Sequence, residues 1–161
     1  MAVFFKDGEL YRMAVEMERN GLAFYSQIAR QAKDESTKAV YTYLITSEKR
    51  HLRKFKSLLH RSAKSSPPES YKGEYRNFLV ALLKDKVFPS SALARSRAAK
   101  SSVRTALDTG IKAEKDSILF YSGLLDLVPE ANKTAIKMIL AEEKRHLQRL
   151  MGYKYKSGCV K

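Results

Sequence analysis

One pentapeptide that occurs twice carries the residue types best suited to chemistry. The sequence Glu-Lys-Arg-His-Leu occupies residues 48–52 and again residues 143–147. On a helix, residues three apart lie on the same face, so the Glu and the His of each copy can converge on one point. A carboxylate and an imidazole directed at one point are suitable ligands for a metal ion.

A second repeated string precedes each copy of the pentapeptide. Glu18 is followed seven residues later by Tyr25, and Glu114 is followed seven residues later by Tyr121, each Tyr standing within Phe-Tyr-Ser. The two halves are offset by 96 residues at this string and by 95 at the pentapeptide. The chain is therefore interpreted as a duplicated helical hairpin, in which each half contributes one lone Glu and one Glu-x-x-His.

Length and composition favour a single helical domain over residues 1–161. The chain has 161 residues and only seven Gly and four Pro, which argues against a turn-rich all-β fold. Its one cysteine, Cys159, excludes an internal disulfide framework and a cysteine-ligated metal site within this chain, so a cytoplasmic location is the expectation. The longest apolar run, residues 78–83, is far too short to span a membrane.

Apolar periodicity and polar or proline breaks predict four long helices. The predicted hairpins cover about residues 8–61 and 102–151, and residues 62–101 connect them. Within that connection, the apolar-rich residues 71–88 are interpreted as an accessory helix. The individual helices are expected at about residues 8–31, 35–61, 102–128 and 130–151.

The predicted helices place the repeated residues at one depth. Glu18 precedes the first turn by about 14 residues and Glu48 follows it by about 13, so both lie roughly 20 Å from that turn. Glu114 and Glu143 stand in the same relation to the turn at Pro129. A connection of this length can cross the bundle and return the third helix parallel to the second. The sequence thus predicts an all-α four-helix bundle with a long crossover connection.

These residues resemble the six ligands of the ferritin-like di-iron carboxylate proteins, in which two helices give a Glu and two give Glu-x-x-His. The Phe-Tyr strings and the connection make the chain most similar to the rubrerythrin-like branch. The resemblance implies that two of the carboxylates bridge two metal ions and that one Glu and one His complete each site. The implied bridging residues are Glu48 and Glu143, with Glu18 and His51 completing one site and Glu114 and His146 completing the other.

The resemblance also implies roles beyond the ligands. Tyr25 and Tyr121 would donate hydrogen bonds to ligand carboxylates. Two features depart from rubrerythrins. This chain has no cysteine pairs of the kind that bind iron in the rubredoxin-like domain, so electrons would have to come from a separate donor protein. Ser117 stands where rubrerythrins have an additional Glu, which puts redox-linked movement of one iron in doubt.

The implied cofactor is a pair of iron ions, with manganese or zinc as alternatives, because carboxylate and imidazole ligands without thiolate suit these ions. Four converging carboxylates repel one another, and two divalent cations neutralise them. The implied activity is that of an oxidoreductase that reduces peroxide or dioxygen. The alternatives are a ferroxidase or iron-handling protein, and a basic polyanion-binding bundle with a structural metal site. A homodimer is the expected assembly.

The charge balance is the second clue to function. Lys and Arg number 31 against 17 Asp and Glu, for a formal net charge of +14. Such a surface attracts polyanions, and residues 84–104 form the densest basic patch. Because the positive charges are spread along every predicted helix, a solvated surface or a docking site for an acidic redox partner is favoured over nucleic-acid binding.

Several residues have simpler interpretations. A single Glu-x-x-His on a basic helix is more often part of a solvated salt-bridge face than a ligand pair, and the duplication is what favours metal binding here. Phe24 and Phe120 are expected in the core. His60, nine residues after His51, is expected to face solvent. Glu16 and Glu142 are interpreted as outer-face or near-site charges and not as ligands.

Overall fold

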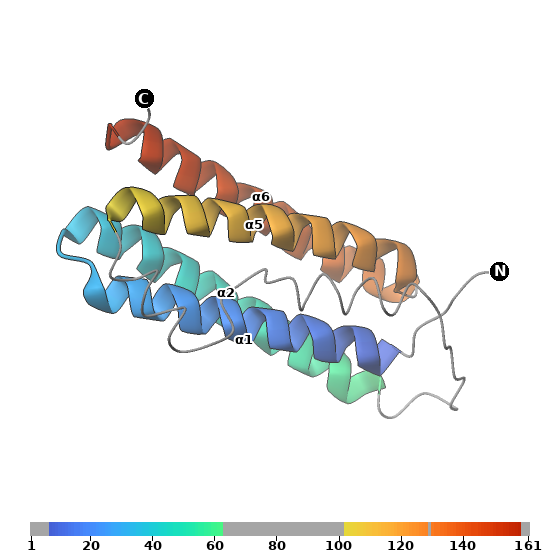
Figure 1. The fold of residues 1–161 in the computed structure, drawn as a ribbon. Coiled ribbons are helices and arrows are strands. Elements are labelled where there is room, and N and C mark those ends of the chain that lie inside the picture. The colour runs from blue at the N-terminus through green and yellow to red at the C-terminus, as the bar shows by residue number, and fades with distance from the viewer. Residues whose placement is uncertain (1–6, 63–101, 129, 159–161) are drawn as a thin grey trace.

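The computed structural model describes residues 7–62, 102–128 and 130–158. The accessory helix predicted at residues 71–88 lies outside the described residues. The described chain contains four long helices (Figure 1), whose bounds are α1 (Asp7–Gln31), α2 (Glu35–Ser62), α5 (Val103–Leu127) and α6 (Glu130–Lys156).

The four helices form two antiparallel hairpins that pack against each other. Helix α1 packs along α2 and α5 packs along α6, while α1 also contacts α5 and α2 contacts α6. Helices α2 and α5 run in the same direction along the bundle, as the long connection predicted (Figure 1). The all-α bundle expected from the sequence is confirmed.

Local chemistry explains where the helices begin and end. The backbone N–H of Thr37 donates to Asp34 Oδ1 at 2.7 Å at the start of α2. The N–H of Thr105 donates to Ser102 Oγ at 3.2 Å at the start of α5. These side chains satisfy backbone donors that a first helical turn leaves unpaired. Val128, which precedes a proline in the sequence, is extended with φ −78° and ψ 149°, so α5 ends before it.

The predicted end of α6 at Met151 was wrong, because the helix continues to Lys156. Side-chain contacts of the last turn hold this extension. Tyr153 Oη lies 3.0 Å from Thr37 Oγ1, and Lys154 Nζ lies 2.5 Å from Asp108 Oδ1. The helix ends near Gly158, whose φ of 69° is a left-handed conformation that glycine adopts without strain.

The core is a continuous column of apolar and aromatic side chains between the hairpins. Phe24 and Phe120 are fully buried in it, as expected, and His60 is exposed. The ring of Phe55 stacks on that of Tyr121, with centroids 5.4 Å apart and planes 9° apart. No helix in the described part of the chain is both long and apolar enough to cross a membrane.

Candidate metal centre

Six acidic and imidazole side chains come together inside the bundle, halfway along it. Each is at most 2% exposed, although carboxylates and imidazoles ordinarily stay in contact with water. All four helices contribute, because the lone Glu of each hairpin and its Glu-x-x-His lie at equal depth. The six are Glu18 from α1, Glu48 and His51 from α2, Glu114 from α5, and Glu143 and His146 from α6.

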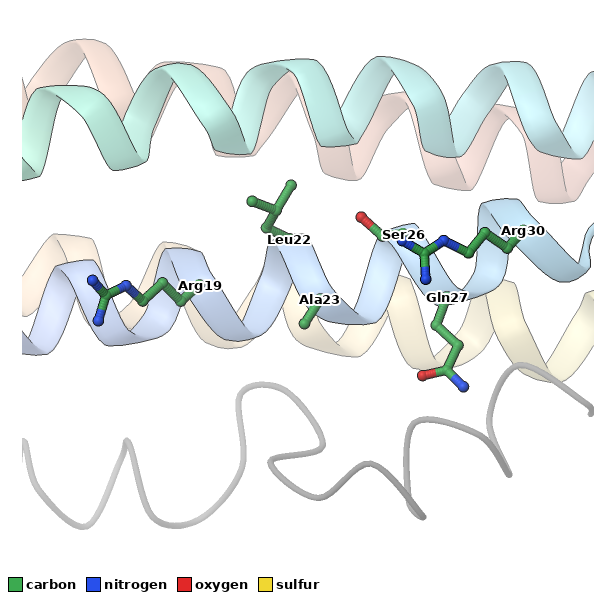
Figure 2. Close-up of a pocket in the computed structure, with 6 residues that line it drawn as sticks. All are labelled: Arg19, Leu22, Ala23, Ser26, Gln27 and Arg30. Atoms are coloured by element: carbon green, nitrogen blue, oxygen red, sulfur yellow. The ribbon is translucent and has the colours of Figure 1, made fainter.

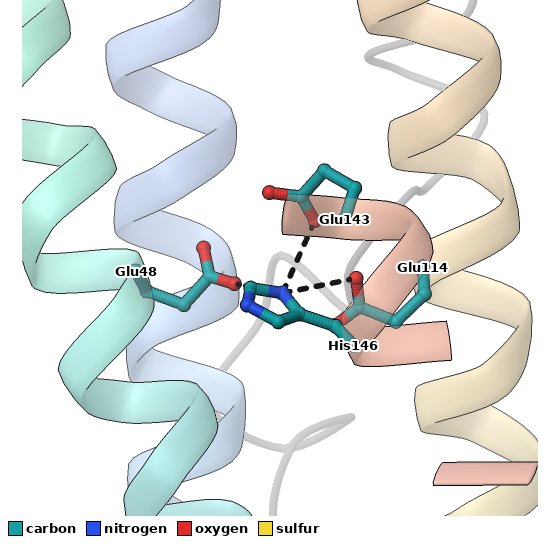
Figure 3. A group of neighbouring side chains, drawn as sticks. All are labelled: Glu48, Glu114, Glu143 and His146. Atoms are coloured by element: carbon teal, nitrogen blue, oxygen red, sulfur yellow. Dashed lines mark ion pairs between the residues drawn. The ribbon is translucent and has the colours of Figure 1, made fainter. Parts of the chain in front are cut away.

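One group of ligand atoms surrounds His146. Its Nδ1 lies 3.5 Å from Glu114 Oε2, 3.5 Å from Glu143 Oε2 and 3.8 Å from Glu48 Oε1. One ligand atom from each of these four residues lies within 4.8 Å of the others. Figure 3 shows the four side chains pointing toward one another from α2, α5 and α6. We call this group the His146 position.

A second group surrounds His51. Its Nδ1 lies 2.9 Å from Glu143 Oε1 and 3.6 Å from Glu18 Oε2. One ligand atom from each of these three residues lies within 4.8 Å of the others, and we call the group the His51 position. Glu143 belongs to both positions, directing one carboxylate oxygen toward each imidazole. The two imidazole rings stack, with centroids 5.7 Å apart and planes 21° apart.

Two tyrosines join the hairpins through these carboxylates. Tyr25 on α1 donates a hydrogen bond to Glu114 Oε1 on α5, at 2.5 Å. Tyr121 on α5 donates one to Glu18 Oε1 on α1. Both tyrosines are fully buried, and burial together with the nearby carboxylates raises the pKa of each phenol well above its usual value. The phenols therefore keep their protons and remain hydrogen-bond donors at neutral pH.

Glu142 is the site residue whose role the sequence did not reveal. The ring N–H at His51 Nε2 donates to Glu142 Oε2 at 2.7 Å, and Arg50 Nη2 donates to the same oxygen at 2.5 Å. Although partial burial raises the pKa of Glu142, these two donors outweigh that effect and lower it. A glutamate that looks like a surface charge thus reaches across from α6 to hold an imidazole of α2. The available signal was the acidic residue directly preceding Glu143.

Burial and crowding shift the pKa values of the central groups in opposite directions. Burial, reinforced by neighbouring carboxylates, raises the pKa of Glu48, and burial with the nearby Glu143 raises that of Glu114 to about 8. Burial alone would lower the pKa of each histidine. The negatively charged carboxylates beside each ring prevail and raise it to about 11 for His51 and about 10 for His146. The same imidazoles overcome the effect of burial on Glu143 and lower its pKa.

Several buried polar atoms at the centre lack hydrogen-bond partners among the described residues. They are Glu18 Oε2, Glu48 Oε1, Glu114 Oε2, Glu143 Oε1, His51 Nδ1 and both ring nitrogens of His146. Buried polar atoms are nearly always paired, so a cluster of unpaired oxygens and nitrogens directed inward fits a pair of cations. Oxygen and imidazole donors without thiolate suit divalent iron, manganese or zinc.

A cavity of about 170 Å³ between α2 and α6 reaches the centre at His51 and Glu142. Arg50 and Lys54 give its rim positive charge, and its apolar side consists of Ala135, Met138 and Ile139. A larger hollow of about 370 Å³ runs along the outer face of α1, with Arg19 and Arg30 at its two ends (Figure 2). None of the six central residues lines that hollow, whereas His51 lines the smaller cavity.

Apart from residues 102–104, the basic patch predicted at residues 84–104 lies outside the described chain. Glu16 is exposed and has no place at the centre, as expected. Ser117, three residues after Glu114, is 3% exposed.

Comparison with known proteins agrees with this geometry. The family model described as Rubrerythrin matches residues 9–154. Among solved structures, the chain is similar to a Thermotoga maritima protein described as a ferritin-like diiron-carboxylate protein. The two are 24% identical, with a TM-score of 0.71, over 98% of this chain and 99% of the other. A search of curated proteins gave no match. The structural likeness confirms that the bundle has the ferritin-like fold.

Proposed function

This chain belongs to the rubrerythrin family, and we propose that it is a di-iron oxidoreductase that reduces hydrogen peroxide, or dioxygen, with electrons from a separate donor. The observation that carries the proposal is the pair of ligand groups sharing Glu143, buried and with their inward atoms unpaired. Each group offers one imidazole and at least two carboxylates, which is a suitable donor set for one iron ion.

We assign the six central residues as ligands. Glu18 and His51 would hold one ion, Glu114 and His146 the other, and Glu143 would bridge them. Glu48 would be the second bridge, since its carboxylate belongs to the His146 position and also interacts with that of Glu18. When bound in the ferrous state, the pair supplies the two electrons that reduce peroxide to water, with two protons taken up.

The protein's own side chains orient these ligands and keep water out. Tyr25 and Tyr121 each fix one terminal carboxylate from the opposite hairpin, so the relative position of the two hairpins determines the geometry of both metal positions. Phe55 packs on Tyr121 and Phe24 contacts Tyr25, which excludes solvent from the phenols. A dry, preorganised site strengthens electrostatic interactions with the reacting oxygen atoms.

The cavity between α2 and α6 favours peroxide reduction over iron uptake. A volume of about 170 Å³ has room for a peroxide molecule and several waters. Because Arg50 is paired with Glu142, Lys54 carries the remaining positive charge among the described lining residues, and this charge repels Fe²⁺ but not a neutral or anionic oxidant. A ferroxidase would need repeated entry of Fe²⁺, which this charge opposes.

The proposal is tested by loading the protein with Fe²⁺ under anaerobic conditions and mixing it with each oxidant in a stopped-flow spectrometer. We expect two iron ions per chain, oxidation by peroxide faster than by dioxygen, and no second turnover until a reductant is added. Glu143→Gln should abolish paired metal binding, whereas Glu130→Gln, an exposed site on the same helix, should behave like the wild type.

Two results would overturn this proposal. Faster oxidation by dioxygen with continued conversion of added Fe²⁺ to ferric mineral would establish the ferroxidase alternative. A loaded protein inert to both oxidants would reduce the centre to a structural metal site.

A further inference from the structure

The two histidines of the centre are equivalent in sequence but not in their surroundings. The residue four positions before His51 is Ser47, and the residue four positions before His146 is Glu142. Helices α2 and α6 contact each other, and Glu142 on α6 reaches the imidazole of His51 on α2. Ser47 is the equivalent residue on α2, so the duplication places a carboxylate at this position in one half and a serine in the other.

The contacts of the outward ring nitrogens differ accordingly. His51 Nε2 donates to Glu142 Oε2 at 2.7 Å, and Arg50 holds that carboxylate from the other side. His146 Nε2 is fully buried and has no hydrogen-bond partner among the described residues. Its ring instead meets the edge of Tyr43, with centroids 5.8 Å apart and planes 87° apart. The Ser47 hydroxyl oxygen accepts a hydrogen bond from Arg50 Nη2 at 3.1 Å.

A carboxylate on the outward nitrogen has two effects on a metal-binding imidazole. It fixes the ring so that the other nitrogen faces the metal, and it makes that nitrogen a stronger donor. In this protein the inward Nδ1 of His51 faces Glu143 at 2.9 Å, whereas the nearest carboxylate oxygens lie 3.5 Å from Nδ1 of His146. The imidazole with the shorter distance to a carboxylate at Nδ1 is therefore that of His51, whose Nε2 is hydrogen-bonded to Glu142.

Most other contributions to the two metal positions cancel by the internal symmetry. Glu143 serves both positions, and Glu48 interacts with residues of both. The terminal carboxylates Glu18 and Glu114 each accept one hydrogen bond from a buried tyrosine of the other hairpin. In this structure Glu48 groups with the His146 position alone. Once Glu48 bridges both ions as proposed, the remaining difference is the group behind each imidazole.

Resting on the proposed di-metal function, we infer that Glu142 is a positioning residue that makes the two metal positions unequal. The His51 position binds its ion first and more tightly, and the His146 position fills second. The protein can therefore exist with one metal ion bound at a defined place, and the ion at the His146 position is the one that exchanges more readily.

The test is a titration of the metal-free full chain with Co²⁺ at fixed pH, followed by calorimetry and visible absorption. We expect the wild type to bind two ions in two resolved steps. Glu142→Ala should weaken the first step by 10- to 100-fold and leave the second within about threefold, so that the steps merge. Glu142→Gln keeps a neutral hydrogen-bond acceptor, so its first-step affinity should lie between those of the wild type and Glu142→Ala. Glu130→Ala, an exposed carboxylate of the same helix, is the matched control.

A spectroscopic signature separates positioning from general structural damage. In the diamagnetic Zn²⁺ protein, the solvent-exchangeable imidazole N–H of His51 should resonate further downfield than that of His146, because it is bonded to a carboxylate. In Glu142→Ala this resonance alone should move upfield and exchange faster.

The possible failures are distinguishable from one another. Two equal steps in the wild type, or an unchanged first step in Glu142→Ala, would overturn this inference while leaving the di-metal proposal intact. Failure of the wild type to bind two ions would overturn both.

Discussion

Metal binding at this centre should release protons in a number that the structure specifies. Three of the candidate ligands hold a proton at pH 7 in the metal-free protein, because their pKa values are about 11, 10 and 8 for His51, His146 and Glu114. Each must lose that proton to bind a cation. We therefore expect about three protons released per pair of divalent ions at pH 7, and Glu48, whose pKa is also raised, adds up to a fourth.

The magnitude follows from proton linkage. Three displaced protons make the overall binding constant rise about 1,000-fold per pH unit, or roughly 4 kcal/mol. With ordinary pKa values of 6.5 for histidine and 4.5 for glutamate, the same ligands would release only about half a proton at pH 7. The difference between three protons and one half is large enough to measure.

The sign can be checked on the stability of the metal-free protein. Groups whose folded pKa is raised stabilise the fold below their unfolded values and lose that contribution as pH rises through the folded values. For Glu114 the loss falls between pH 4.5 and about 8, and for the two histidines it falls between pH 6.5 and about 10 to 11. The lowered pKa of Glu143 acts in the opposite sense and matters only in acid. Metal should therefore raise the melting temperature more at pH 8 than at pH 6.

The assay is isothermal titration of the metal-free protein with Mn²⁺ or Zn²⁺ in buffers of different ionisation enthalpy, from which the number of released protons is obtained. Metal at 100 times its Kd should also stabilise the fold by about 2.7 kcal/mol, or roughly 5–10 °C for a chain of this size. Glu114→Gln should lower the proton count by one. Release of less than one proton by the wild type would refute the charge arrangement described above.

Two further predictions concern the residues that support the centre. Tyr121→Phe and Tyr25→Phe each remove one buried hydrogen bond to a terminal carboxylate and should each weaken metal binding by about 10- to 100-fold with little change in the far-ultraviolet spectrum; unchanged affinity in both would show that the phenols do not orient the ligands. Phe55→Ala removes a fully buried ring stacked on Tyr121 and should cost about 3–5 kcal/mol in chemical denaturation of the metal-free protein. The control is Leu119→Ala, at a position 56% exposed, which should change the free energy of unfolding by less than about 0.5 kcal/mol. An effect as small as this for Phe55→Ala would contradict the stacking argument.

The sequence predicted the depth of the six central residues because depth is a local property. Helix rise and the distance from a turn determine how far along the bundle a residue lies, so the positions of Glu18 and Glu48 follow from counting. The depth of Glu114 and Glu143 follows in the same way from the second hairpin. What counting cannot give is rotation of one hairpin against the other, which decides that Tyr25 bonds Glu114 and that Tyr121 bonds Glu18.

Two features escaped prediction for related reasons. Helix α6 was expected to end near Met151 because its last residues are polar, yet Tyr153 contacts Thr37 and Lys154 pairs with Asp108, and both partners lie far away in the sequence. Glu142 was interpreted as an outer-face or near-site charge because its position in the sequence gives no sign of a partner. Its partner His51 belongs to the other hairpin, so only the folded bundle shows the contact.

The same reasoning explains why a duplicated sequence need not give a symmetric centre. Duplication copies the residues that each hairpin contributes, but the outward nitrogen of His51 is bonded by Glu142 of the opposite hairpin, whereas that of His146 has no hydrogen-bond partner among the described residues. A substitution at one of two equivalent positions, here Ser47 against Glu142, therefore changes the histidine of the other half. Because Glu143 directs one carboxylate oxygen toward each imidazole, a second ion would bind to a bridge already engaged by the first. A chain with two identical ligand strings can thus hold two metal ions of unequal affinity through a single residue that is not a ligand.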